Sequence, residues 1–268
     1  MAPTPGQPLL LIENLHVSVG DRFVLRGINL VIGEGETHVL LGPNGGGKTT
    51  LLNTLVGLPA YRITKGRMLF RGIDLAPLPI DERARLGIGM AFQRPPSVRG
   101  VKLRQLIAVA AQRHAETASG NTTMPTEAEL EQLVDGLTTD LALERMIDRD
   151  VNMGFSGGEM KRSEMAQLLA QSPNLALFDE PESGVDLDNI AVVGGAIARL
   201  LKGERANEPR RAGIIVTHTG HILQYVNADE GHVLFGGKLA CSGNPRDLVA
   251  EIGRDGFEKC VECAICLK

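Results

Sequence analysis

The sequence predicts an α/β domain, and three observations support this fold class. Short apolar segments alternate with helical stretches along much of the chain. A glycine-rich turn follows the continuous apolar segment Thr37–Leu41 and precedes a helical stretch. Two later apolar segments, Leu175–Phe178 and Gly213–Thr217, each run into polar residues. Such polar positions at strand ends are typical of the ligand-binding edge of an open parallel sheet.

The composition limits the classes of function. A chain of 268 residues, 43% hydrophobic and 22% charged, suits one folded domain and excludes a disordered chain. A net charge of −4 argues against nucleic acid and against a polybasic membrane anchor. We find neither an apolar segment long enough to span a membrane nor a signal peptide, and four cysteines do not form a disulfide framework. We therefore expect no direct membrane insertion and a cytoplasmic location.

The first part of the chain is expected to form short strands and one helix, because apolar runs are separated by glycine-containing turns. The run Thr37–Leu41 is apolar enough to be a buried strand, and Thr49–Val56 after it has a helical pattern. The remaining strands are expected at Leu9–Leu15, Val17–Val19, Val24–Leu25, Ile28–Ile32, Arg67–Phe70 and Gly72–Leu75.

Residues 101–150 are expected to be mostly helical, with a polar link at 114–126 that contains Ser-Gly-Asn and a proline. From residue 163 the alternation of helices and strands returns. A charged loop is expected at 202–212, and short strands continue to residue 240. The helices are expected at Leu103–Arg113, Glu127–Leu137, Asp140–Arg145, 159–171 and 188–201.

The glycine-rich turn fits the phosphate-binding pattern G-x-x-x-x-G-K-[ST] between a strand and a helix. Its glycines let backbone N–H groups surround phosphate oxygens at a helix N-terminus. Lys48 would reach the β- and γ-phosphates, and the Thr49 hydroxyl would ligate Mg²⁺. The alternative is a simple turn with a solvated lysine. The predicted nucleotide contacts here are Gly42, Pro43, Asn44, Gly45, Gly46, Gly47, Lys48, Thr49 and Thr50.

Asp179 and Glu180 follow the apolar strand Leu175–Phe178. Two adjacent carboxylates at a strand end repel each other unless a cation lies between them. We predict that Asp179 binds Mg²⁺ and that Glu180 polarises the attacking water. The alternative is a pair of solvated acids that begins a turn.

His218 ends the strand Gly213–Thr217, where an imidazole could donate to the γ-phosphate and respond to its loss. His221, three residues later, could form a metal pair with it, but a solvated loop is the simpler interpretation of two histidines without further ligands.

Ser156-Gly157-Gly158-Glu159 precedes a predicted helix. The spacing of the serine and the glutamate is that of a capping box, which starts a helix. Two adjacent glycines also leave N–H groups open to an anion.

The order of these motifs resembles that of ABC-type ATPases. The phosphate loop, Gln93, the Ser-Gly-Gly-Glu segment, the strand ending at Glu180, Ser183-Gly184-Val185-Asp186 and His218 follow in that order. The resemblance implies a RecA-like P-loop core with an antiparallel β subdomain and an inserted α-helical subdomain at about 94–165, in one domain spanning 1–258. It implies ATP and Mg²⁺ as ligands, with Gln93 touching Mg²⁺ or water and reporting to a partner.

In that family the segment that corresponds to Ser156-Gly157-Gly158-Glu159, here called the signature segment, completes the ATP site of the opposite subunit. The resemblance therefore implies an ATP-dependent dimer in which each site combines Lys48 of one chain with Ser156, Gly157, Gly158 and Glu159 of the other. Asp186 is expected at the same site. The predicted catalytic residues are Glu180, His218, Lys48 and Gln93, with Thr49, Gln93 and Asp179 at Mg²⁺.

Within the family, the chain resembles the SufC-type ATPases of the Suf iron–sulfur assembly system, from about Leu9 to Phe257. The resemblance is carried by Leu15–Val19, Arg26–Ile28, Met90–Gln93, Phe155–Arg162 and Asp186–Asp188, and by Asp255-Gly256-Phe257. It implies a SufB-like or SufD-like scaffold as partner. The alternative is the nucleotide-binding subunit of a membrane transporter. Val19 stands where many transporter ATPases have an aromatic residue that stacks on adenine, so we expect weak base selectivity.

The last ten residues, 259–268, depart from the family pattern. Cys260, Cys263 and Cys266 have Cys-x-x-Cys-x-x-Cys spacing, which suits iron–sulfur ligation. A four-iron cluster usually needs a fourth thiolate, which Cys241 or a partner could supply. The alternatives are Zn²⁺ and a reduced tail without a metal.

Overall fold

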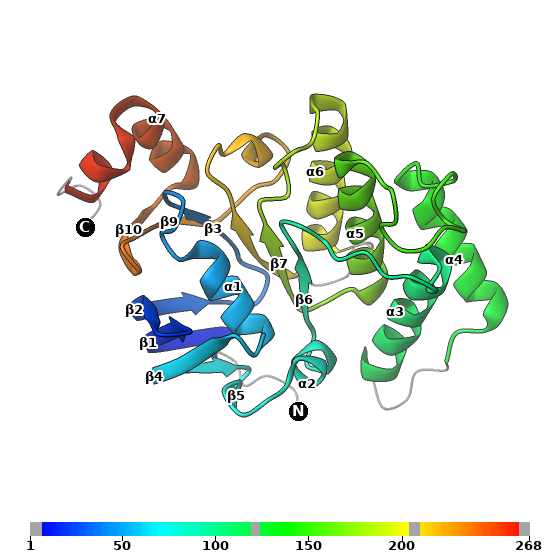
Figure 1. Ribbon diagram of the computed structural model, residues 1–268, viewed down its shortest axis with the longest axis horizontal. Coiled ribbons are helices and arrows are strands. Elements are labelled where there is room, and N and C mark those ends of the chain that lie inside the picture. The colour runs from blue at the N-terminus through cyan, green and yellow to red at the C-terminus, as the bar shows by residue number, and fades with distance from the viewer. Residues whose placement is uncertain (1–6, 119–123, 204–209, 263–268) are drawn as a thin grey trace.

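The computed structural model describes residues 7–118, 124–203 and 210–262, and it contains two sheets (Figure 1). The six-stranded sheet has the order β10-β9-β3-β8-β7-β6, and all its neighbours except β9 and β10 run parallel. These strands are β3 (Thr37–Leu41), β6 (Ile88–Ala91), β7 (Leu175–Asp179), β8 (Ala212–Val216), β9 (Glu230–Phe235) and β10 (Lys238–Gly243). The predicted α/β fold class is confirmed.

The four-stranded antiparallel sheet has the order β2-β1-β4-β5. It consists of β1 (Leu10–Val19), β2 (Arg22–Ile32), β4 (Tyr61–Phe70) and β5 (Ile73–Asp74). Its apolar side chains share one core with α1 (Lys48–Val56) and with one face of the parallel sheet. The two sheets therefore bury a common apolar layer, which covers one face of β3 and leaves its other face to a second core.

A second core lies on the other face of the parallel sheet and extends among the helices. Figure 1 shows α3 (Leu103–Ala118), α4 (Glu127–Asp140) and α5 (Gly157–Gln171) together at the end opposite the antiparallel sheet. Both α4 and α5 start with a capping box, at Thr126 and at Ser156. The other helices are α2 (Ile80–Arg85), α6 (Leu187–Lys202), η1 (His221–Gln224) and α7 (Pro245–Glu262).

Several predicted elements differ in extent from the structure. The four early strands are two long ones, because residues between the apolar runs pair across β1 and β2 with bulges. Strand β4 begins at Tyr61 instead of Arg67, since its exposed first half pairs with β1. The predicted helix Asp140–Arg145 is wrong. Helix α4 ends at Asp140, and Ala142 has a φ of +49°, which turns the chain.

Strand β6 and the helices α2 and α7 were not predicted. Both β6, with four residues, and α2, with six, are short enough that their sequence pattern is weak. Within α7 the helical geometry is broken at Gly256, whose φ is +79°. Among the described helices, none is long and apolar enough to cross a membrane.

Candidate functional site

The phosphate loop connects β3 to α1 through four glycines, and a Cβ atom at Gly42, Gly46 or Gly47 would lie less than 3.0 Å from another residue. Gly42 has a φ of +153°, and a Cβ atom there would lie 2.2 Å from the carbonyl oxygen of Leu234. Gly47, with a φ of +108°, is the N-cap of α1 and supplies no side-chain cap. The first N–H groups of α1 are therefore left for an anion, as the sequence pattern predicts.

Lys48 lies inside this loop. Its Nζ donates to the carbonyl oxygens of Gly42 at 2.7 Å and Pro43 at 3.1 Å. Burial lowers the pKa of Lys48, while the charges of Glu180 and Asp179 act in the opposite direction. The loop thus holds the ammonium group close to the predicted phosphate site.

Thr49 and Asp179 come together from α1 and β7, as predicted. The Thr49 hydroxyl donates to Asp179 Oδ1 at 3.1 Å. Burial raises the pKa of Asp179, and among the described residues its Oδ2 atom has no hydrogen-bond partner. A buried carboxylate oxygen beside a hydroxyl is the oxygen donor set that Mg²⁺ prefers, so the residues present fit this ion.

Glu180 receives donors from two other predicted site residues. Its Oε2 accepts from Gln93 Nε2 at 2.6 Å, and its Oε1 lies 2.9 Å from His218 Nδ1. A carboxylate only accepts, so the second contact favours the His218 tautomer with the proton on Nδ1. Glu180 also has a φ of +49° and donates its N–H to the carbonyl oxygen of Val216 in β8. Strands β7 and β8 and the segment after β6 therefore fix this carboxylate together.

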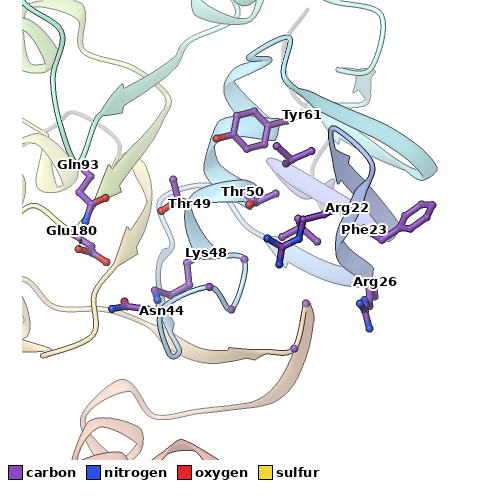
Figure 2. Close-up of a pocket in the computed structure, with 17 residues that line it drawn as sticks. Arg22, Phe23, Arg26, Asn44, Lys48, Thr49, Thr50, Tyr61, Gln93 and Glu180 are labelled. Atoms are coloured by element: carbon purple, nitrogen blue, oxygen red, sulfur yellow. Dashed lines mark hydrogen bonds between the residues drawn. The ribbon is translucent and has the colours of Figure 1, made fainter.

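The loop, Gln93 and Glu180 line one pocket of about 690 Å³ (Figure 2). On the side of the antiparallel sheet, sequence reasoning missed several lining residues. Phe23 is 62% exposed at the start of β2, and Tyr61 begins β4, where its hydroxyl accepts from Asn53 at 2.8 Å. The sequence did offer one signal for Phe23, because this aromatic residue follows the Gly20-Asp21 turn closely. The other missed lining residues are Arg22, Val24, Arg26, Gly236 and Gly237.

The signature segment does not line this pocket. Ser156 and Glu159 cap α5, and their side chains and N–H groups bond to each other. A Cβ atom on Gly157 would lie 2.7 Å from the carbonyl oxygen of Gly184. A Cβ atom on Gly158 would likewise lie 2.7 Å from the Asn189 side chain, which accounts for glycine at both positions.

Asp186 also lies outside the pocket. It caps α6 by accepting from the N–H of Asn189 at 2.9 Å, and this hydrogen bond lowers its pKa. Within one chain, the structure brings Lys48, Thr49, Gln93, Asp179, Glu180 and His218 together and keeps the segment 156–159 and Asp186 apart from the pocket.

A buried ion pair that the sequence did not reveal links α5 to the segment before Gln93. Lys161 Nζ donates to the carbonyl oxygen of Phe92 at 2.5 Å, and Glu164 Oε1 accepts from the Phe92 N–H at 2.8 Å. Burial raises the pKa of Glu164 to about 7 and lowers that of Lys161. Lys161 and Glu164 therefore fix both backbone groups of Phe92, the residue directly before Gln93.

The predicted cluster ligands in the tail lie at the edge of the described part of the chain or beyond it. The backbone of Cys260 belongs to α7, but its side chain, together with Cys263 and Cys266, lies outside the described part of the chain. Cys241, the fourth candidate thiolate, lies in β10 and is buried in the second core, on the face of the parallel sheet away from the antiparallel sheet.

Comparisons with known proteins agree with this geometry. The family model for ABC transporters matches residues 25–183. The chain is 38% identical to the "Probable ATP-dependent transporter SufC" of Escherichia coli, covering 93% of this chain and 97% of that one. It is 35% identical to the "Iron-sulfur cluster assembly protein SufC" of Plasmodium berghei, covering 95% and 68%. It is also 35% identical to a "Probable ABC transporter ATP-binding protein" of Streptococcus pyogenes, covering 93% of each.

Solved structures show the same fold. The ATP-binding subunit of an ABC transporter superposes with a TM-score of 0.72 at 22% identity, covering 97% of this chain and 100% of that one. A dimeric ATP-binding cassette with bound ADP and Pi superposes with a TM-score of 0.71 at 22% identity, covering 88% and 99%.

Proposed function

Since this chain belongs to the ABC transporter family of ATPases and is of the SufC type, we propose that it is the ATP-hydrolysing subunit of an iron–sulfur cluster assembly machine. In this proposal it dimerises on ATP and drives a conformational change in a SufB-like or SufD-like scaffold. Residues 1–258 are one ATPase domain, with the helical subdomain at about 94–165 and a separate tail at 259–268.

The residues that line the pocket, together with Asp179 and His218 beside it, divide the steps of ATP hydrolysis among them. The loop N–H groups and Lys48 would bind the β- and γ-phosphates, and Thr49 and Asp179, with Gln93, would hold Mg²⁺. When bound there, Mg²⁺ would neutralise negative charge on the phosphate oxygens. Glu180 accepts a proton from the attacking water, and the His218 Nδ1–H donates either to this carboxylate, which it orients, or to the γ-phosphate.

The dimer is supported by one observation, namely that the signature segment lies outside the pocket of its own chain. The N-terminus of α5, with Ser156 and two glycines, does not line the pocket of its own chain. A second chain placed opposite supplies its Ser156, Gly158 and Asp186 to this pocket and receives the same residues in return. ATP favours the closed dimer because only that state contacts each γ-phosphate from both sides, and hydrolysis reopens it.

The motion reaches the scaffold through the segment that follows Gln93. A second pocket of about 160 Å³ lies beside this segment, between it and α5, and its lining includes Phe92, Pro96 and Leu106. Gln93 contacts Glu180 in the nucleotide site at one end of the same segment. A structural change at the γ-phosphate can therefore reach a partner bound at residues 93–100 through this one segment.

The test of this function is co-purification with the product of the neighbouring gene, followed by iron and sulfide analysis. A β-rich scaffold that retains iron and sulfide in an ATP-dependent manner is the expected result. A partner with several membrane spans would instead support the second candidate, a transporter subunit. The Streptococcus pyogenes relative, a probable ABC transporter ATP-binding protein, favours that candidate.

We further propose that Cys260, Cys263 and Cys266 bind an iron–sulfur cluster, with Zn²⁺ as the competing metal. Support comes from the spacing of the thiolates. Anaerobic reconstitution with iron and sulfide should give a visible chromophore that the triple serine variant lacks. A chromophore equal in both proteins, or absent from both, would contradict a cluster on these residues.

A further inference from the structure

Two buried imidazoles meet in the parallel sheet, away from the residues that line the nucleotide pocket. His38 of β3 is 2% exposed and His232 of β9 is 4% exposed. His38 Nδ1 and His232 Nε2 are 2.8 Å apart, and the two rings are stacked with centroids 5.0 Å apart. Neither residue has a part in ATP hydrolysis as described above.

The outer nitrogen of each ring has its own oxygen partner. His38 Nε2 lies 3.2 Å from the Glu36 carboxylate, and His232 Nδ1 lies 2.6 Å from the Ser242 hydroxyl. When both outer nitrogens carry protons, the inner nitrogens present two lone pairs to the same point. Metal-binding histidines are held in this way by outer-shell oxygens.

A carboxylate completes the group. Glu230 lies opposite His38 in the parallel register of β3 and β9, so the two side chains share a face of the sheet. One ligand atom from each of Glu230, His38 and His232 lies within 4.8 Å of the other two. Glu230 is half-buried, which gives the group access to solvent at its outer side.

We propose that His38 Nδ1, His232 Nε2 and a Glu230 oxygen bind one divalent transition-metal ion of the Zn²⁺ class. Two imidazoles with one carboxylate suit this class, whereas Mg²⁺ and Ca²⁺ prefer oxygen ligands alone. Two nitrogens at tetrahedral Zn²⁺ lie about 3.3 Å apart, given bonds of about 2.0–2.1 Å. The present separation of 2.8 Å therefore needs only a small ring rotation.

The same two histidines can instead form a simple hydrogen bond, with one inner nitrogen donating to the other. Such a bond does not involve Glu230, and the metal site does. Replacing Glu230 therefore distinguishes the two states without disturbing the buried rings.

Binding at this site would link β3, which leads into the phosphate loop, to β9, which packs against that loop. His38 precedes Gly42 by four residues in β3, and His232 is two residues before Leu234, whose carbonyl oxygen packs against Gly42. A bound ion would hold β3 and β9 together directly below the loop. We therefore expect the metal to raise the thermal unfolding temperature of the nucleotide-free chain.

The test uses the full-length chain with Cys260, Cys263 and Cys266 replaced by Ser, so that tail thiolates cannot bind the probe. Zn²⁺ is titrated into the metal-depleted protein by calorimetry, and Co²⁺ is added to follow visible absorption. We expect about one Zn²⁺ per chain, tetrahedral Co²⁺ bands without thiolate charge transfer, and a rise in unfolding temperature.

Glu230→Gln is expected to weaken Zn²⁺ binding at least about tenfold and to leave the unfolding temperature in chelator unchanged. His232→Ala should abolish binding, and if this variant does not fold, Glu230→Gln decides alone. His221→Ala, at an exposed histidine in η1, is the matched control and should bind as the parent does. Zn²⁺ affinity that is the same in Glu230→Gln as in the parent, or no stoichiometric binding by the folded parent, would overturn the proposal.

Discussion

Replacing Glu180 by Gln is predicted to stop ATP turnover while ATP binding persists. The carboxylate accepts from Gln93 Nε2 at 2.6 Å and lies 2.9 Å from His218 Nδ1. A glutamine amide has one accepting oxygen and one donating NH₂ group, so it cannot accept a proton from water and loses one of these two contacts. Within the described part of the chain, the phosphate-binding loop and Thr49 make no hydrogen bond to the Glu180 side chain, so the substitution leaves their ATP contacts in place.

The loss of a positioned general base lowers the rate by about 10²–10⁴-fold. This range corresponds to about 3–5 kcal/mol in the activation barrier. Single-turnover phosphate release under saturating MgATP measures the rate, and calorimetry measures ATP affinity. Light scattering after gel filtration should show a dimer with ATP that persists because hydrolysis no longer reopens it.

Asp179→Asn is the matched control, because it removes the neighbouring carboxylate and spares the base. It should weaken the Mg²⁺-dependent part of ATP binding, which Glu180→Gln leaves intact. Phosphate release near the parent rate in Glu180→Gln would refute the assignment of Glu180 as the base.

Three further predictions follow from the same structure. Burial raises the pKa of Glu164 to about 7, so between pH 4.5 and 7 this carboxyl binds more protons in the folded chain than in the unfolded chain. The free energy of unfolding should therefore fall as the pH rises through this range, and this one group contributes about 3 kcal/mol at most. Urea unfolding at pH 5 and pH 7 should show a flatter pH dependence in Glu164→Gln, and an unchanged slope would contradict this. Gly42→Ala should destabilise the chain by about 2 kcal/mol or more in urea, because its Cβ would meet the Leu234 carbonyl oxygen at 2.2 Å. Because the aliphatic Val19 lines the pocket where many transporter ATPases have a stacking aromatic residue, hydrolysis rates of ATP and GTP should be comparable, and a strong ATP preference would count against weak base selectivity.

The central strands and the phosphate site could be predicted from the sequence because their signals are local. Thr37–Leu41 is a continuous apolar run, and the loop after it carries its pattern within eight residues. Strand β7 delivers Asp179 to Thr49 because parallel strands end at one edge of the sheet.

Other features depend on contacts between distant segments, which no local pattern reveals. The exposed first half of β4 is a strand only because β1 lies beside it. Lys161 and Glu164 can hold the Phe92 backbone only because the fold places α5 against this residue. His38 and His232 are 194 positions apart in sequence, and the sheet order brings them together. Tyr61 reaches the pocket in the same way, through the fold of the antiparallel sheet.

The most direct test of the composite ATP site is a mixing experiment with two variants. Lys48→Ala removes the phosphate lysine but keeps the signature segment, and Ser156→Arg blocks the exposed start of α5 but keeps the phosphate loop. Each variant alone should hydrolyse ATP only at background rate. The mixture should regain partial turnover, because a mixed dimer contains one complete site. A mixture that forms mixed dimers and stays inactive, or a Ser156→Arg chain that is active by itself, would contradict an ATP site shared between two chains.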